Sequence, residues 1–278
     1  MEDPYNKKIF EKYAKLVKFG ASLQAPFLNW GYWETETDKV PDTRAEASLN
    51  LLMQVVRKAK IRKEHYVLDV GCGLGATSFE TFRISECQKI IGIDMCCPEI
   101  EYARKTFEDY RDNVEFKCMN ATQLEFDSET FDRVMGIECA FHFKTRELFL
   151  KQTKRVLKTD GKLILTDWIK GDTGEGKFAS FFANLVLTYW NIPPKNIVNK
   201  KQYKIILEQN GFKNIEVYSI AQHVIPPYIK YIQSKKGNRE LRGSMGKFDT
   251  MLYSIMLTVV NRLYKKNMID YVLVYAEK

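Results

Sequence analysis

The chain has no long apolar run. Residues 178–190 are its longest candidate, but they fall short of the about 18 apolar residues that a membrane-spanning helix needs, and they include Asn184 and Thr188. The N-terminal residues also lack the basic-then-apolar order of a secretory signal. We therefore expect a cytoplasmic protein, for which peripheral contact with a membrane surface stays open.

Metal-binding patterns are missing as well. The six cysteines include no C-x-x-C pair and the three histidines stand far apart, so the sequence predicts no metal site. Because no export signal is present, the cysteines are expected to be free thiols in a reducing compartment. We expect the vicinal pair Cys96 and Cys97 to be small packing residues rather than a redox pair.

Internal repeats, low-complexity segments and linkers are absent too, so we predict a single domain over residues 1–278. A hydrophobic content of 45% and a charged content of 28% are ordinary for a soluble globular protein. The net charge of +8 is spread along the chain rather than gathered in blocks. Such a charge permits an acidic partner but does not identify one.

A glycine-rich turn is the strongest local pattern in the chain. Residues 66–70 form an apolar run typical of a buried strand, and residues 76–85 are typical of a helix. Between them stand Gly71, Gly73 and Gly75. A strand, a glycine turn and a helix begin a nucleotide-binding unit, in which the backbone turns sharply and a ligand lies close to it. These glycines would also suit a dinucleotide, so the turn alone does not identify the ligand.

Two acidic residues indicate which nucleotide the turn binds. Asp69 precedes the turn, where it would repel a dinucleotide's pyrophosphate by about 4 kcal/mol for unit charges ~4 Å apart at an effective dielectric of ~20. S-Adenosylmethionine instead carries an ammonium and a sulfonium, which a carboxylate attracts. Asp94 follows the apolar run 89–93 and is placed to accept the ribose hydroxyls of an adenosine cofactor. The pattern therefore predicts an S-adenosylmethionine site; the alternative is a strand–helix turn without a ligand.

Strands and helices alternate through the first part of the chain. Further strands are predicted over residues 90–94, 114–118, 131–137 and 162–166, and helices over 98–109 and 145–157. This alternation favours a Rossmann-like, doubly wound α/β sheet, whose ligands lie beyond the carboxyl ends of its strands. Six polar residues follow predicted strand ends and are expected to converge there, namely Asp69, Asp94, Asn120, Glu138, His142 and Asp167.

The remaining segments are expected to cover this core. Helices are predicted over residues 4–19, 43–57, 175–189, 200–209 and 226–262, and strands over 212–220 and 269–276. We divide the domain into a helical N-terminal cap (1–58), a cofactor-binding core (60–170) and two substrate-lid insertions (171–211 and 221–266). An aromatic loop, residues 26–33, has two interpretations: a packed lid, or ring faces of Tyr32 and Trp33 that attract a sulfonium.

Together these segments resemble a class I S-adenosylmethionine-dependent methyltransferase. The motifs around the family's first, second, fourth and fifth strands are matched by residues 67–75, 91–94, 131–134 and 156–163. Within the class, residues 29–33 and 138–143 are similar to small-molecule O-methyltransferases that act on natural-product sugars such as those of macrolides. Quinone, tocopherol, sterol and phosphobase methyltransferases resemble the chain only slightly less.

The resemblance implies a seven-stranded sheet whose last strand is antiparallel. It also implies that Asp94 holds the ribose, that Met95 packs on the adenine and that Ala121 offers its N–H to the ring. Asn120 stands where many relatives have an aspartate, and its amide oxygen can still accept a bond from the adenine amino group. The other expected cofactor-binding residues are Tyr32, Asp69, Gly71, Gly73, Gly75 and Glu138.

The implied reaction is in-line transfer of a methyl group from S-adenosylmethionine to a small-molecule acceptor, here taken as a hydroxyl, with the protein mainly positioning and desolvating. His142 is the candidate base, with Asp167 holding its imidazole or binding the acceptor; the alternative for His142 is a core histidine.

The sequence also permits other functions. One is methylation of a lipid-like quinone or sterol, or of an amine, at a membrane surface; another is a non-catalytic S-adenosylmethionine binder. A nucleic-acid substrate is not expected, because residues 136–140 lack the Asn/Asp-Pro-Pro-aromatic motif of amino-methylating enzymes. The sequence does not indicate an oligomeric state.

Overall fold

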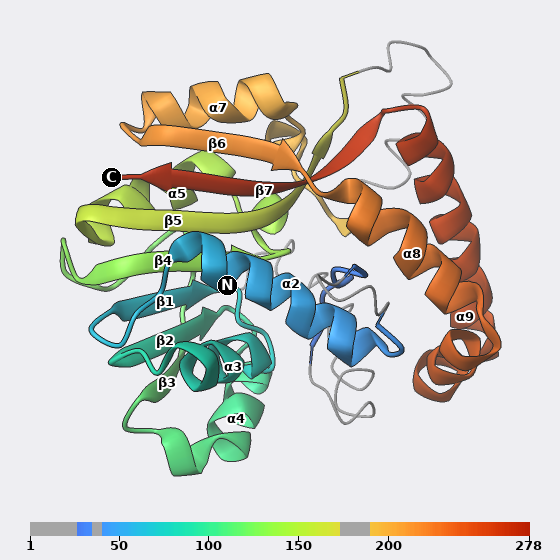
Figure 1. Ribbon diagram of the computed structural model, residues 1–278, viewed down its shortest axis with the longest axis horizontal. Coiled ribbons are helices and arrows are strands. Elements are labelled where there is room, and N and C mark those ends of the chain that lie inside the picture. Colours follow the sequence, from blue (N-terminus) through green and yellow to red (C-terminus); the bar gives the residue numbers. More distant parts are fainter. Residues whose placement is uncertain (1–26, 35–40, 173–189) are drawn as a thin grey trace, which may run out of the picture.

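A seven-stranded sheet forms the centre of the molecule in a computed structural model that describes residues 27–34, 41–172 and 190–278 (Figure 1). The strands are β1 (Tyr66–Val70), β2 (Lys89–Asp94), β3 (Val114–Cys118), β4 (Phe131–Ile137), β5 (Leu157–Lys170), β6 (Lys213–Ser219) and β7 (Ile269–Glu277). Their spatial order is β3-β2-β1-β4-β5-β7-β6. β1 to β5 pair in parallel, whereas β7 is antiparallel to both β5 and β6. The predicted Rossmann-like α/β fold and its antiparallel last strand are confirmed.

Helices cover both faces of the sheet. They are α2 (Arg44–Ala59), α3 (Ala76–Ser85), α4 (Cys97–Thr106), α5 (Arg146–Val156), α7 (Lys200–Gln209), α8 (Ala221–Gln233) and α9 (Lys235–Lys265), with short 3₁₀ turns η1 (Glu108–Tyr110), η2 (Ala140–His142) and η3 (Pro194–Asn196). Successive strand residues point to opposite faces, so Val67 joins one apolar cluster and Leu68 the other. The first cluster contains residues of α2, α4, α8 and α9, and the second those of α5 and α7.

Polar residues fix where several helices begin. Thr43 accepts a hydrogen bond from the backbone N–H of Glu46 (3.2 Å) before α2, and Thr145 caps α5 in the same way. Asn199 and Gln202 form a reciprocal capping box before α7. These starts lie within one or two residues of those predicted from the sequence.

Two predictions on this part of the chain are wrong. The fifth strand was expected over residues 162–166, but β5 runs from Leu157 to Lys170. Leu157 pairs with Phe131 of β4, and β7 pairs with β5 as far as Lys170. Asp167 therefore lies inside a strand rather than after one. The cysteines are also not all free: Cys97 and Cys118 form a disulfide, because the β2–β3 register sets Cys118 beside Asp94, three residues before Cys97. Cys72, Cys87, Cys96 and Cys139 are free and buried.

Some predictions cannot be compared with the structure. The helices expected over residues 4–19 and 175–189 lie outside the described residues, so the division into cap, core and lids stays a prediction. Within the described ranges, none of the helices combines the length and the apolar character that crossing a membrane would take.

Candidate active site

The glycine turn joins β1 to α3 and leaves one stretch of backbone uncovered. Gly71, Gly73 and Gly75 all have positive φ angles, of 67°, 52° and 86°. A Cβ atom on Gly71 would lie 2.5 Å from Cβ of Cys139, so that glycine serves close packing. Among the described residues, a Cβ atom on Gly73 would meet only Leu28 and Glu99, at 3.4 and 3.6 Å. Gly73 is therefore the point at which a ligand can approach the backbone.

Asp69 supports the turn from below. Its side chain is fully buried, and Oδ2 accepts hydrogen bonds from the hydroxyls of Thr77 and Ser78, both at 2.7 Å. Burial raises the pKa of this carboxyl to about 6, although the two hydroxyl donors oppose the shift. Asp69 thus ties the end of β1 to the first turn of α3, and its charge acts on the site through the turn.

Asp94 meets the turn from the neighbouring strand. Its Oδ2 accepts a hydrogen bond from the backbone N–H of Gly73 (3.1 Å), and Oδ1 accepts one from the N–H of Cys96 (2.9 Å). The structure therefore brings together the second-strand acid and the glycine turn.

A third acid, Glu99, was missed in the sequence. It is the third residue of α4 and only 2% exposed. A glutamate at that position often accepts from the backbone N–H at the helix cap, but that donor, Cys96 N–H, is already bonded to Asp94. Among the described residues no group hydrogen-bonds to Oε1 of Glu99. Burial and then the charge of Asp94 raise the pKa of Glu99 to about 8. The available signal in the sequence was a glutamate in the first turn of the helix that follows the second-strand acid.

The residues expected at the adenine differ in how they are arranged. Met95 is half-buried and Ala121 is buried, both next to the β2–β3 edge. Asn120, however, uses its amide oxygen locally: Oδ1 accepts from the N–H and the hydroxyl of Thr122, both at 2.9 Å. The predicted acceptance of the adenine amino group would require that this turn give up one of its bonds.

The aromatic loop packs against α8 and β5. The ring of Trp30 stacks on Tyr228 with centroids 4.3 Å apart and meets Trp168 edge-on at 4.8 Å. Trp33 is buried, and its ring lies 4.8 Å from that of Tyr231. These contacts favour the packed-lid interpretation for Trp33.

Tyr32, like Trp33, packs against a ring of α8. It is half-buried, its ring lies 4.8 Å from that of His223, and its backbone N–H donates to the carbonyl of Ala47.

Glu138 links the aromatic loop to the sheet. Its Oε1 accepts a hydrogen bond from the backbone N–H of Trp30 (2.7 Å) and lies 2.9 Å from the hydroxyl of Tyr271 on β7. Burial raises the pKa of Glu138 to about 7, and these donors oppose the shift. A left-handed backbone at Glu138 (φ 54°) turns the chain from β4 into η2.

His142 lies past the end of β4, where the sequence places it, whereas Asp167 does not lie past a strand end. His142 ends η2, half-buried, with its ring 4.1 Å from that of Phe141. Asp167 is fully buried: Oδ2 accepts from Nε of Arg146 (2.9 Å) and from the hydroxyl of Tyr203 (2.8 Å), and Oδ1 accepts from the N–H of Trp168. The prediction of a carboxylate that faces an imidazole or an acceptor is therefore corrected to a buried ion pair with Arg146.

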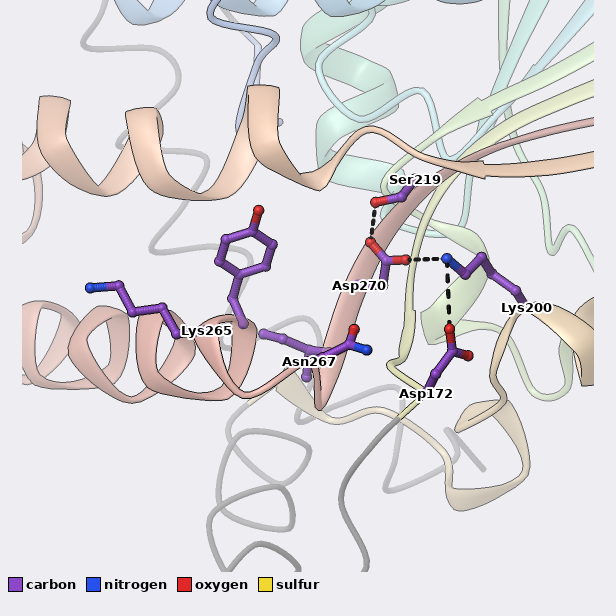
Figure 2. A pocket seen from close by; sticks show the side chains of 8 residues that line it. Asp172, Lys200, Ser219, Lys265, Asn267 and Asp270 are labelled. Atoms are coloured by element: carbon purple, nitrogen blue, oxygen red, sulfur yellow. Dashed lines mark hydrogen bonds and ion pairs between the residues drawn. The ribbon is translucent and has the colours of Figure 1, made fainter.

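A hollow of about 410 Å³ lies where the start of α7, the end of β6, the start of β7 and the end of α9 meet (Figure 2). Its walls include Asp172, Lys200 and Asp270, and none of the predicted site residues lines it. Lys200 lies 3.2 Å from Asp270 and 3.9 Å from Asp172, so these charges pair with one another. In the part of the chain that the structure describes, no His, Cys, Asp and Glu side chains are grouped as a metal site.

Comparison with known proteins identifies the family. Residues 68–165 match a family model described as a methyltransferase domain. The erythromycin 3''-O-methyltransferase of Saccharopolyspora erythraea is 31% identical over 235 residues, which cover 82% of this chain and 75% of that enzyme. The chain belongs to the S-adenosylmethionine-dependent methyltransferases. Its cofactor is S-adenosyl-L-methionine, and it is an enzyme of the class I, small-molecule type.

A second relative of this methyltransferase and a solved structure match it almost end to end. The 27-O-demethylrifamycin SV methyltransferase of Amycolatopsis mediterranei is 23% identical and covers 100% of this chain and 99% of that one. The geranyl diphosphate C-methyltransferase of Streptomyces coelicolor, solved with Mg²⁺, geranyl diphosphate and S-adenosyl-L-homocysteine, superposes with a TM-score of 0.76 at 12% identity over 99% of this chain and 98% of that chain. At that identity the likeness shows the fold.

Proposed function

We propose that this methyltransferase transfers a methyl group to a hydroxyl of a small natural product. The observation that carries the proposal is the 31% identity over most of the chain to an O-methyltransferase whose name specifies a macrolide. The rifamycin relative, which matches the whole chain, is also named for a substrate that lacks an O-methyl group.

The cofactor half of the site is supported by the geometry of the glycine turn. The open backbone at Gly73 and the carboxylate of Asp94 would hold the ribose side, with Glu99 as a third group there. Asp69, under the turn with Gly71 and Gly75, favours a positively charged ligand. Met95 and Ala121 would contact the adenine, with Asn120 beside them. When bound, S-adenosylmethionine supplies an electrophilic methyl group.

The acceptor half would lie between η2 and the aromatic loop. His142 stands at the carboxyl end of β4 and would take the hydroxyl proton as that oxygen attacks. Glu138 fixes the distance between the two segments through Trp30 and Tyr271, and Tyr32 would border the methyl-donating end. Asp167 would act at a distance from the acceptor, by fixing the end of β5 through its bonds with Arg146 and Tyr203.

The test is transfer of a labelled methyl group to a panel of hydroxylated macrolides, followed by mass identification of the product. His142→Ala should lower kcat at least a hundredfold, the lower range of general-base effects (~10²–10⁴), and should leave S-adenosylhomocysteine binding unchanged. His65→Gln, at the opposite edge of the sheet, serves as the matched control. Unchanged turnover in His142→Ala would remove the base, whereas labelled amines with no labelled alcohol would change the acceptor class.

The same screen addresses the alternative acceptors. The screen includes quinones, sterols and amines. It also includes nucleic acids, because the expectation that they are not substrates is a prediction. A protein that binds S-adenosylhomocysteine but labels nothing would support the non-catalytic alternative.

A further inference from the structure

Four large apolar side chains lie exposed on one face of α9. Phe248 is 67% exposed, Met251 52%, Leu252 43% and Ile255 56%. They stand at positions i, i+3, i+4 and i+7, which a helix presents side by side. We call them the α9 stripe. The other exposed large apolar residues in the described ranges belong to separate elements: Tyr110, Leu148, Ile205 and Tyr218. Single exposed apolar residues are ordinary, whereas a contiguous set marks a contact surface.

The stripe is not the face that α9 uses for its own packing. Leu257 and Val260, on the other side of the helix, are fully buried, and Met256 and Leu263 are nearly so. The hydroxyl of Tyr253 lies 2.8 Å from that of Tyr228, which fastens α9 to α8. α9 stands at the outer edge of the molecule, beyond α8 (Figure 1). The orientation of the helix is thus set by its inner face.

Positive charge brackets the stripe. Lys247 precedes it, and Arg262 and Lys265 follow it on the same helix. α9 is kinked at Gly246, and the segment after the kink holds the stripe with three basic residues against one acid, Asp249. The segment before the kink carries four more basic residues and one acid, Glu240, which accepts hydrogen bonds from the hydroxyl of Tyr231 at 2.8 and 2.9 Å. The apolar surface therefore faces outward in a basic setting.

We propose that the α9 stripe docks on an anionic lipid surface. A second copy of the chain is disfavoured, because both ends of the stripe are basic and either orientation of two stripes sets like charges together. An anionic bilayer complements these charges, and its headgroup region receives apolar side chains from a convex helix face. This inference does not depend on which acceptor is methylated, although docking would bring the enzyme to acceptors dissolved in lipid.

Co-sedimentation with lipid vesicles tests the docking. The whole chain is mixed with phosphatidylcholine vesicles, with or without phosphatidylglycerol. We expect binding to the anionic vesicles and at least a tenfold loss of affinity for Phe248→Gln/Ile255→Gln. We expect no loss for Leu148→Gln, which replaces an apolar residue that is 49% exposed on α5. Calorimetric titration with S-adenosylhomocysteine shows that each variant is folded.

The charges are tested separately. Lys247→Gln/Arg262→Gln should weaken binding to anionic vesicles about fivefold per charge, and added salt should reduce the difference. The proposal fails if the unaltered chain stays in the supernatant, or if the stripe variant sediments as well as the unaltered chain. It also fails if sedimentation equilibrium shows a dimer that the stripe variant abolishes, because the stripe would then join two copies.

Discussion

At the residue scale, the cofactor site concentrates buried acids beneath one turn of backbone. Asp94 accepts hydrogen bonds from the backbone N–H groups of Gly73 and Cys96. Glu99 lies beside it, and none of the described residues hydrogen-bonds to its Oε1. Two neighbouring carboxyls in a buried place cannot both ionise cheaply, so one holds a proton. Glu99 is that one, with its pKa raised to about 8 by burial and by Asp94.

Replacing Glu99 should change how stability depends on pH. The unfolded chain releases this proton near the ordinary value of 4.5, and the folded state only near 8. Between those values the folded state binds more protons, so its stability falls as pH rises. Glu99→Gln removes this loss. The melting temperature of the variant minus that of the unaltered protein should therefore increase from pH 5 to pH 8. Glu101→Gln, exposed on the same helix, is the control; a constant difference across the range would contradict the assignment.

Removing the Glu138 carboxylate should loosen the aromatic loop. Glu138→Ala leaves the N–H of Trp30 without this acceptor, whereas the hydroxyl of Tyr271 keeps its bond to Oγ1 of Thr166 (3.0 Å). Each buried group left unpaired costs about 1–3 kcal/mol. Chemical denaturation should show that loss, and Glu138→Gln, which keeps a carbonyl oxygen, should recover most of it. Equal stability of the Ala and Gln variants would mean that the hydrogen bonds contribute little.

At the element scale, Arg146 fastens three elements together. It begins α5, and its guanidinium reaches Asp167 on β5 and the carbonyl of Asn196 in η3. Tyr203 of α7 shares the same carboxylate oxygen. The end of β5, next to the proposed acceptor side, is therefore held by a buried ion pair.

Breaking this pair from one side should be costly. Arg146→Met leaves Asp167 as an uncompensated buried charge, for which we expect a loss of about 3–5 kcal/mol in the free energy of unfolding. Adding Asp167→Asn removes the charge, keeps a carbonyl oxygen for Tyr203 and should restore part of that loss. Arg83→Met, from the exposed pair of Arg83 and Glu80, should change stability only slightly. A single variant as stable as the control would show that the pair contributes nothing.

Features carried by short contiguous segments could be predicted from the sequence, and features that depend on distant pairing could not. The strand–glycine–helix unit and Asp94 lie within two such segments, so their meeting followed from the topology. The extension of β5 to Lys170 depends on pairing with residues 269–277, about a hundred positions later. Arg146 and Asp167 are likewise joined across elements, so Asp167 looked like a free carboxylate past a strand end.

At the scale of the whole molecule, cofactor binding should be coupled to folding. A ligand that binds only the folded state at a hundred times its Kd stabilises it by about 2.7 kcal/mol. S-Adenosylhomocysteine should therefore raise the melting temperature, and Asp94→Ala should lower its affinity at least tenfold by calorimetry. Asp112→Ala, at an exposed position, is the control. Equal affinity in both variants would remove Asp94 from the site.

The place of β7 has a consequence for synthesis on the ribosome. β7 lies between β5 and β6, and within the described residues β6 pairs with no other strand. While residues 269–277 are still inside the exit tunnel, the edge of β5 from Lys162 to Lys170 lacks its partner strand, and the peptide groups that point to that edge stay unpaired. The nascent chain consequently cannot close its sheet stepwise behind the emerging polypeptide, and this open edge is where a chaperone would have to shield it from aggregation.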